Sequence, residues 1–251
     1  MINFAVCISG HLRTFNLLKN NYFSFLEFLK KKGNVDVFLT TWNYLNADTG
    51  YHLEHLNKNL KVNNLHLEKT PSTSFLKKHF KAKKIQIFDQ DFFASSYSPL
   101  RWNLLCKEDL SGSASAQQNC VFHFCKMLFL INQCNLLKSQ EEFDNQKKYN
   151  VVFRIRPDYF FDEFLINTLN ILKISPFTLY SSAIHSELDD QFIYGDSYSM
   201  DFFSNSLMRL SDLFNNKITF NHEDVILESI KKYSFIKIHN IPVMGHIERG
   251  S

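Results

Sequence analysis

The apolar positions of this chain form short runs and helical stripes that alternate along its length. Residues 3–9 are mostly apolar and end at Ser9-Gly10, a pattern typical of a buried strand followed by a turn. Apolar residues then recur at helical spacing over residues 14–32, and a second apolar run follows at 35–40 and closes on Thr41-Trp42. A strand, a helix and a strand in this order predict the first unit of a Rossmann-like sheet.

The same alternation continues through the rest of the sequence. Further strands are predicted at residues 85–88, 149–155, 177–181, 189–194 and 235–241, and further helices at residues 116–139, 199–214 and 222–232. Gly33 is expected to end the first helix, and Gly195 to break the strand at 189–194. No internal repeat or low-complexity linker interrupts the pattern. We therefore predict one α/β domain over residues 1–251, with a Rossmann-type mixed sheet flanked by helices.

Composition and charge remove several classes of protein. Apolar residues make up 45% of the chain, which favours a sizeable core over intrinsic disorder. A formal net charge of +3 is too small for a dedicated nucleic-acid binder. The five cysteines show no CxxC spacing, which favours free thiols in a reducing compartment. No secretory signal or membrane span is predicted, so we expect a cytoplasmic protein.

Polar residues follow the first predicted strand, at the end where open α/β sheets bind ligands. Gly10 permits close approach of the backbone to a ligand, and the start of the next helix favours an anion. Arg13 adds a positive charge suited to a phosphate group. The alternative is an ordinary strand-to-helix turn, because neither known glycine-rich phosphate pattern is present.

A second set of polar residues follows the strand at 149–155. Alternation places Arg154 and Arg156 on the same side of the strand, where two positive charges require anions such as a diphosphate. Asp158 follows them and could hold a divalent cation that bridges the diphosphate. The alternative is an internal Arg–Asp ion pair that fixes the loop.

Acidic residues gather in the second half of the chain, at Asp189-Asp190 and at Glu223-Asp224. A carboxylate beside a cleft can accept the proton of an attacking hydroxyl group. Glu223 and Asp224 also stand where a helix is expected to begin, and acids there stabilise the helix dipole without any catalytic role.

Five segments of the chain resemble bacterial glycosyltransferases of lipopolysaccharide and capsule synthesis, the WavE-like and related enzymes with a GT-A fold. The segments are residues 8–14 (ISGHLRT), 36–42 (DVFLTTW), 154–158 (RIRPD), 190–195 (DQFIYG) with Met200, and 222–224 (HED). Their order and spacing extend over nearly the whole chain. The resemblance implies transfer of a sugar from a nucleotide-sugar donor to a saccharide acceptor. Residues from about 1 to 160 would bind the donor, and those from about 161 to 251 the acceptor.

The resemblance also implies roles for individual residues. Enzymes of this fold hold the donor diphosphate through Mn²⁺ or Mg²⁺ on an Asp-x-Asp motif, and Arg156-Pro157-Asp158 stands in its place. Asp158 then inherits the metal role, with His246 (or His239) as a second ligand; alternatively, Arg156 neutralises the diphosphate itself and makes the cation dispensable. The implied catalytic acids are Asp224 as the first choice of base, Asp190 as its rival, and Glu223. The implied donor-binding residues are Ser9, Gly10, His11, Arg13, Thr41, Trp42, Arg154, Arg156 and Asp158.

The expected partners follow from this activity. The acceptor is an oligosaccharide or lipid-linked saccharide at the inner face of the cytoplasmic membrane, and no nucleic acid is expected. Contact with the membrane would be peripheral, through the basic residues 77–84, unless these form only a solvated surface. Two other readings stay open: a different transferase that uses nucleotide-activated donors, and a catalytically silent nucleotide-sugar-binding subunit of an assembly complex.

Overall fold

The structure is a computed structural model of the chain. It describes residues 1–45, 69–96, 114–167, 169, 171–182, 188–209, 222–233 and 235–247.

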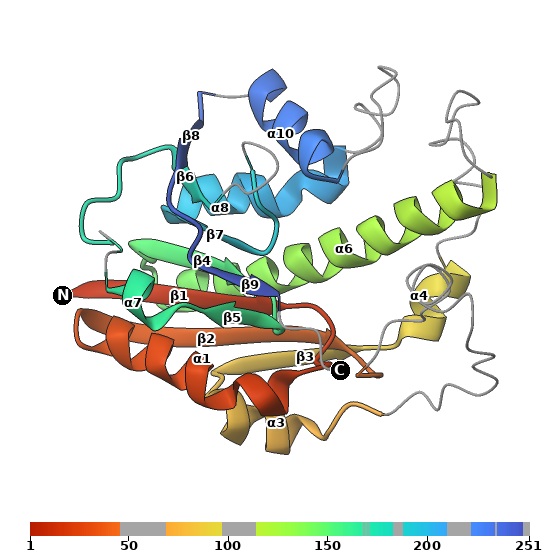
Figure 1. Cartoon of the computed structure of the whole chain (residues 1–251), viewed down its shortest axis with the longest axis horizontal. Coiled ribbons are helices and arrows are strands. Elements are labelled where there is room, and N and C mark those ends of the chain that lie inside the picture. Colours follow the sequence, from red (N-terminus) through yellow and green to blue (C-terminus); the bar gives the residue numbers. More distant parts are fainter. Residues whose placement is uncertain are drawn as a thin grey trace.

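A mixed β-sheet forms the centre of the described part (Figure 1), with its seven strands in the order β3-β2-β1-β4-β7-β6-β8. The strands are β1 (Ile2–Ser9), β2 (Gly33–Trp42), β3 (Lys84–Phe88), β4 (Val151–Ile155), β6 (Thr178–Ser181), β7 (Phe192–Gly195) and β8 (Lys237–Asn240). β7 runs antiparallel to β4 and β6, and all other neighbours are parallel. Two short strands, β5 (Tyr159–Phe161) and β9 (Gly245–Ile247), pair separately in antiparallel fashion. A mostly parallel, helix-flanked sheet of this kind is compatible with a Rossmann-like fold.

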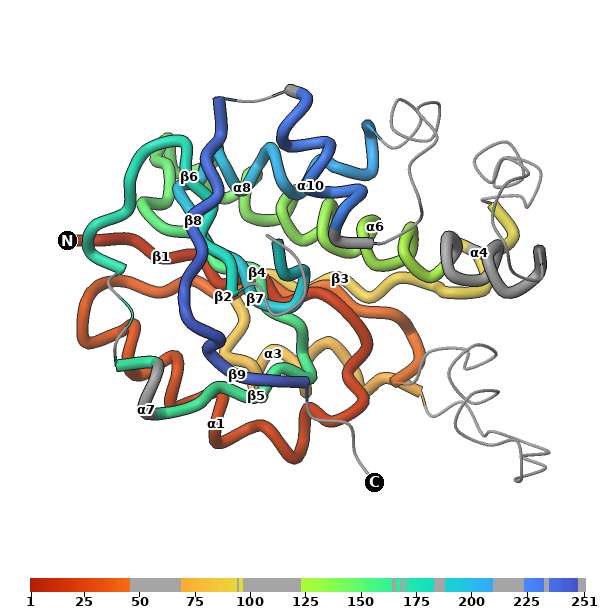
Figure 2. Tube along the Cα trace, turned by 45° about the horizontal axis from the view of Figure 1, so that its top comes forward, coloured from red at the N-terminus to blue at the C-terminus, as the bar shows by residue number. Residues whose placement is uncertain are grey.

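Helices cover both faces of the sheet (Figures 1 and 2). One face carries α6 (Ala114–Asp144), α8 (Ser197–Ser204), the 3₁₀ helix η1 (Asn205–Arg209) and α10 (His222–Tyr233). The other face carries α1 (Phe15–Lys30), α3 (Thr73–Phe80) and α7 (Glu163–Ile166), while α4 (Gln90–Ser96) follows β3. Across the described residues, no helix combines the length and the apolar character that a membrane span requires.

Alternation along the central strands divides the core into two layers. In β1, Phe4, Val6 and Ile8 pack in the cluster that contains the buried residues of α1, whereas Ala5 and Cys7 pack with α6 and α8. Both faces of β1 are therefore apolar, as expected for a parallel strand covered by helices on both sides. The buried thiols of Cys7, Cys125 and Cys134 are free, which confirms the expectation for these three cysteines.

Several predicted boundaries differ from the structure. Gly33 does not end the first helix; it is the first residue of β2, where the carbonyl of Ile2 lies too close to leave room for a side chain. Residues 189–191 precede β7 and are not part of it. Gly195 does not break this strand but ends it, where a Cβ would lie 2.6 Å from the carbonyl oxygen of Thr178.

Helix ends also differ, for visible reasons. α8 begins at Ser197, earlier than predicted, because the carboxylate of Asp196 accepts hydrogen bonds from the backbone of Tyr198 and Ser199. α6 extends to Asp144, five residues beyond the predicted end. The remainder of the helix predicted at 199–214 becomes η1 up to Arg209, and residues 210–214 lie outside the described part.

Candidate functional site

The carboxyl ends of the parallel strands meet at one edge of the sheet. Register pairs Ser9 of β1 with Thr40 of β2, and Ile8 with Ile155 of β4. β7 runs the opposite way, so its beginning lies at this same edge, where the backbone N–H of Arg156 donates to the carbonyl of Gln191 at 3.0 Å. The polar residues that follow β1 and those at the end of β4 therefore lie near Asp189 and Asp190, at the same edge of the sheet.

Asp158, Arg156 and Arg13 form an ion cluster, and the side chain of Asp158 at its centre is almost fully buried. Arg156 donates from Nε to Oδ1 and from Nη2 to Oδ2, both at 3.0 Å, and Nη2 of Arg13 lies 3.9 Å from Oδ2. Burial alone would lower the pKa of Arg156, but the carboxylates of Asp158 and Asp190 outweigh it and raise this pKa. The internal Arg–Asp ion pair considered as the alternative is thus present.

The contacts of Asp158 bear directly on the expected divalent cation. Both of its carboxylate oxygens accept hydrogen bonds from Arg156, and the guanidinium charges of Arg156 and Arg13 disfavour a divalent cation at this carboxylate. Among the residues that the structure describes, no three His, Cys, Asp or Glu side chains are gathered as a metal site would require. The structure thus shows an arginine at Asp158, and Mn²⁺ or Mg²⁺ at this residue stays a prediction.

Arg154 lies at the same edge and is only 1% exposed. None of its three guanidinium nitrogens has a hydrogen-bond partner among the described residues. Burial lowers the pKa of Arg154 to about 10, against the opposing effect of Asp190, so the group stays charged at neutral pH. A buried charge without hydrogen-bond acceptors is costly, and such groups are usually explained by a bound ion, water or ligand.

Ser9 presents a second unsatisfied polar group on the same side of the sheet. Cys7 lies opposite Arg154 in the parallel register, and Ser9 follows two residues later on the same face of β1. The hydroxyl oxygen of Ser9 is buried and has no hydrogen-bond partner in the described part of the chain. The hydroxyl of Ser9 on β1 and the guanidinium of Arg154 on β4 therefore both lack described hydrogen-bond partners at this edge of the sheet.

Asp189 and Asp190 supply the negative charge opposite the arginines. Asp189 accepts hydrogen bonds from the hydroxyl of Ser182 at 3.1 Å and from the backbone of Gln191 at 2.8 Å, while its own N–H donates to Ser181 Oγ. Burial raises the pKa of Asp189 to about 6. Asp189 is thus held rigidly by its neighbours, whereas Asp190 adds charge near Arg154 and Arg156.

His11 and Trp42 lie at the ends of β1 and β2. Burial, with the charges of Lys126 and Arg13, lowers the pKa of His11 to about 3, so its imidazole is neutral at physiological pH. Trp42 is 1% exposed and stacks on Phe129 at 5.8 Å between ring centroids. Trp42 and Thr41, both expected among the donor-binding residues, are fully buried, and Trp42 packs in an aromatic cluster.

Lys126 is a site residue that the sequence reasoning missed. It belongs to α6, is 2% exposed, and its Nζ lies 5.4 Å from the centroid of the Trp42 ring. The sequence signal that could have identified Lys126 was its position among the apolar residues of a predicted helix, because a lysine is rarely buried without a partner.

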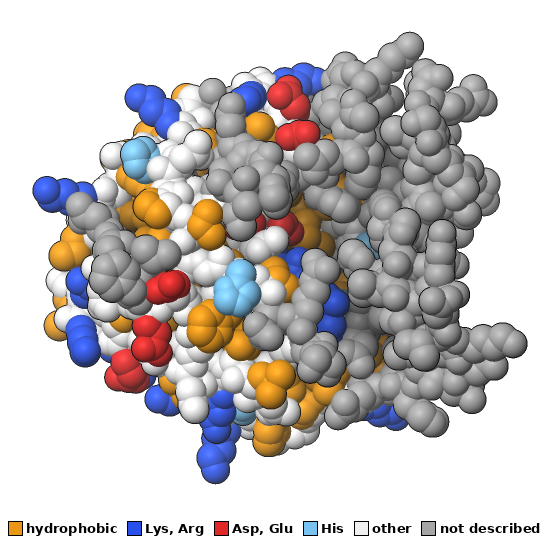
Figure 3. Space-filling view, viewed as in Figure 1, with side chains coloured by type: hydrophobic (Ala, Val, Ile, Leu, Met, Phe, Trp, Pro, Cys, Tyr) orange, Lys and Arg blue, Asp and Glu red, His pale blue; other side chains and the backbone are white. Residues whose placement is uncertain are grey.

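The remaining candidate catalytic and metal-binding residues lie in the second half of the chain. Asp224 lies half-buried in the first turn of α10, and the side chain of Glu223 lies outside the described part. His246 is exposed on β9, opposite Phe160 of the strand that directly follows Asp158. Near the middle of the face shown in Figure 3, acidic and basic side chains lie close together.

Gly10 gives the first test of this arrangement. Its φ of +142° is disfavoured for other residues, and a Cβ would lie 3.0 Å from Cδ of Pro157. Gly10→Ala is therefore expected to lower the free energy of unfolding by about 1–3 kcal/mol, measured by urea denaturation. Ser9→Ala, which adds no strain, is the control and should change it by less than about 1 kcal/mol. Equal losses in both variants would show that the turn is not strained.

Comparison with known proteins adds no assignment. No known protein family matches the chain, and no curated protein does.

Proposed function

We propose that the chain is a glycosyltransferase with a GT-A-type fold that moves a sugar from a nucleotide-sugar donor to a saccharide acceptor in bacterial surface polysaccharide synthesis. The observation that supports this most is Arg154, a fully buried and charged guanidinium group without described hydrogen-bond acceptors, beside Arg156 and Arg13. A diphosphate bound at this edge supplies both the missing acceptors and the negative charge.

The proposed chemistry follows from where charge develops. When the bond between the anomeric carbon and the diphosphate breaks, negative charge grows on the leaving phosphate oxygen. Guanidinium groups already fixed at that position stabilise this charge without reorganisation, which is the usual source of electrostatic catalysis. Arg156 is held in place by Asp158, so Asp158 acts as a positioning residue for it.

A carboxylate completes the proposed reaction. It accepts the proton of the acceptor hydroxyl as this oxygen attacks the anomeric carbon with inversion. Asp224 in the first turn of α10 and Asp190 at the arginine cluster are the two candidates. Asp224 remains the first choice, because Asp190 lies beside the arginines that would bind the leaving group.

Donor binding is the experiment that tests this proposal. Purified protein is screened by thermal shift against UDP-, GDP-, CDP-, CMP- and ADP-sugars, each with Mn²⁺ and with EDTA. We expect one nucleotide class to raise the melting temperature by several degrees, and the shift to persist in EDTA because the cluster has arginines in place of metal ligands. A shift only with Mn²⁺ would return Asp158 to the metal role, and no shift with any donor would contradict the proposal.

The ion pair of Arg156 with Asp158 also suits a second candidate function, a nucleotide-sugar-binding subunit without catalysis. Donor hydrolysis separates the two. A transferase slowly releases the nucleotide from the selected donor, and Asp224→Asn or Asp190→Asn should abolish this release while leaving the thermal shift intact. A donor that binds but is never hydrolysed or transferred would favour the silent subunit.

A further inference from the structure

A groove of about 550 Å³ lies away from the arginine cluster, on the α1 side of β6 and β8. Its described lining includes Lys173, Tyr180, Tyr194, Lys237, His239 and Ile241. This volume suits a small ligand of two or three sugar rings. Every lining residue belongs to the half of the chain expected to bind the acceptor.

The described lining of this groove contains two lysines and no acidic residue. Lys173 and Lys237 are both exposed, and neither side chain forms an ion pair or hydrogen bond with a described residue. None of the described lining residues is acidic. By contrast, Lys83 and Lys84 both pair with Glu141. The groove therefore carries uncompensated positive charge that complements an anion.

Aromatic rings form its floor. Tyr180 lies opposite Tyr194 in the register of β6 and β7, and opposite His239 in that of β6 and β8. The tyrosine rings stack at 4.9 Å between centroids with an angle of 9°, and the His239 ring meets Tyr180 edge-on at 5.2 Å. Rings fixed in this way give a rigid, partly apolar surface with polar edges, as sugar rings with their C–H faces and hydroxyls require.

The wall of the groove is also hydrogen-bonded to residues at the edge of the sheet where the arginines lie. Ile241 in its wall donates from its backbone to the carbonyl of Ser181 at 3.0 Å. The hydroxyl of Ser181 in turn accepts a hydrogen bond from the backbone of Asp189 at 2.6 Å. The groove wall is thus linked to Asp189 at the arginine edge through two hydrogen bonds at Ser181.

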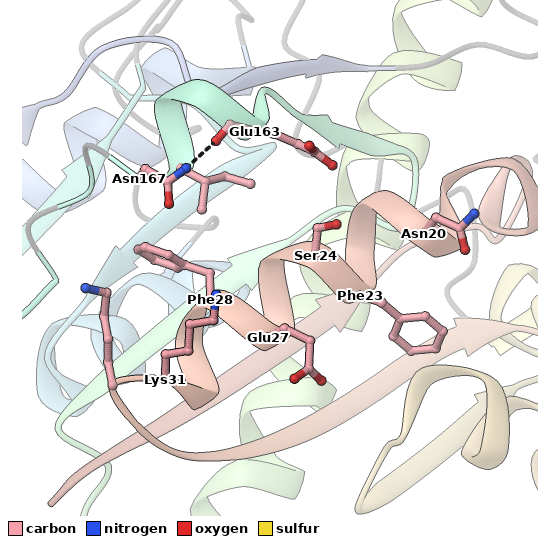
Figure 4. Close-up of a pocket in the computed structure, with 10 residues that line it drawn as sticks. Asn20, Phe23, Ser24, Glu27, Phe28, Lys31, Glu163 and Asn167 are labelled. Atoms are coloured by element: carbon pink, nitrogen blue, oxygen red, sulfur yellow. Dashed lines mark hydrogen bonds between the residues drawn. The ribbon is translucent and has the colours of Figure 1, made fainter.

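A second cavity, between α1 and α7, lacks the excess of one charge that would favour an anionic ligand. Its space of about 590 Å³ is lined by Phe23, Ser24, Glu27, Phe28 and neighbouring residues (Figure 4). Its lining carries charges of both signs, on Glu27, Glu163, Lys31 and Lys32, and Glu27 already contacts Lys30 and Lys81, so this cavity does not favour a ligand of one charge.

From these observations we infer that the groove lined by β6, β8, Leu169 and residues 173–176 binds an anionic segment of the acceptor, a saccharide that carries carboxylate or phosphate groups. The lysines bind the anionic groups, and the aromatic floor positions the sugar rings. This inference rests on the proposed function for the identity of the ligand as an acceptor, but the binding itself is tested without any donor.

Titration calorimetry at low salt tests it with three probes: trigalacturonate, neutral maltotriose and glucose 6-phosphate. The variant is Lys173→Glu/Lys237→Glu, and the matched control is Lys77→Glu/Lys78→Glu, which reverses two exposed charges on α3. We expect trigalacturonate or glucose 6-phosphate to bind at least tenfold more tightly than maltotriose. We also expect the groove variant to lose at least tenfold in this affinity, and the control less than twofold.

Loss with trigalacturonate identifies a carboxylated ligand, and loss with glucose 6-phosphate a phosphorylated one; either supports the inference. Equal binding of maltotriose, equal losses in both double variants, or no binding of either anion would overturn it. The donor screen runs separately on the same proteins. Groove binding without any donor shift would contradict the proposed function alone, and a donor shift without groove binding would contradict this inference alone.

Discussion

Replacement of Lys138 by alanine is expected to lower the free energy of unfolding by about 3–5 kcal/mol, because it removes the buried partner of Glu142 and Asp201 and leaves the exposed Lys148 as the remaining described countercharge of these acids. Lys138 lies on α6 and is fully buried. Its Nζ donates to Ser197 Oγ at 2.8 Å and to Asp201 Oδ1 at 2.6 Å, and lies 3.2 Å from Glu142 Oε2. Glu142 is itself only 4% exposed, so water cannot replace the lost partner. Urea denaturation measures the change.

The same network supplies its own control. Lys148 contacts the same two acids, at 2.8 Å from Glu142 and 3.4 Å from Asp201, but 66% of its side chain is exposed. An exposed ion pair contributes less than about 1 kcal/mol, so Lys148→Ala should be nearly neutral. Similar losses in the two variants would show that burial does not determine the contribution of this network.

The sheet was predictable from the sequence wherever a strand is apolar on both faces. β1, β2 and β4 are covered by helices on both sides, so they appear as continuous apolar runs that need no partner to be recognised. Their ends were less predictable, because pairing decides them: β2 extends to Trp42 since Thr41 and Trp42 pair with Ile87 and Phe88 of β3. β5 and β9, of three residues each, were missed because so short a segment shows no periodicity.

The candidate site was predictable in its residue types and not in its partners. Alternation placed Arg154 and Arg156 on one side, and both guanidinium groups interact with the same acids. The sequence alone could not decide whether Asp158 faces a cation or an arginine, because that depends on a side-chain rotation within the Arg156-Pro157-Asp158 turn. Nor could it show that Trp42 is buried, since this results from contacts with Phe93 and Phe129 that are distant in sequence.

Arg156→Ala is expected to weaken donor binding by a factor of about 30 or more, corresponding to the 2–5 kcal/mol that removal of one member of a buried charge pair costs. The guanidinium that it removes is the one that Asp158 holds in a fixed orientation. Arg156→Lys keeps the charge but not the fork of two parallel donors, so it should recover only part of the affinity. The dissociation constant of the donor selected by thermal shift is the measurement.

Asp158→Asn separates the two roles considered for Asp158. If Asp158 only positions Arg156, the amide still accepts one hydrogen bond, so donor affinity should fall less than in Arg156→Ala and stay insensitive to EDTA. If Asp158 binds a cation that bridges the diphosphate, Asp158→Asn should be the more damaging change, and EDTA should remove binding by the wild type. The order of the two variants thus decides which group carries the diphosphate, and each protein's melting temperature without donor shows whether it is still folded.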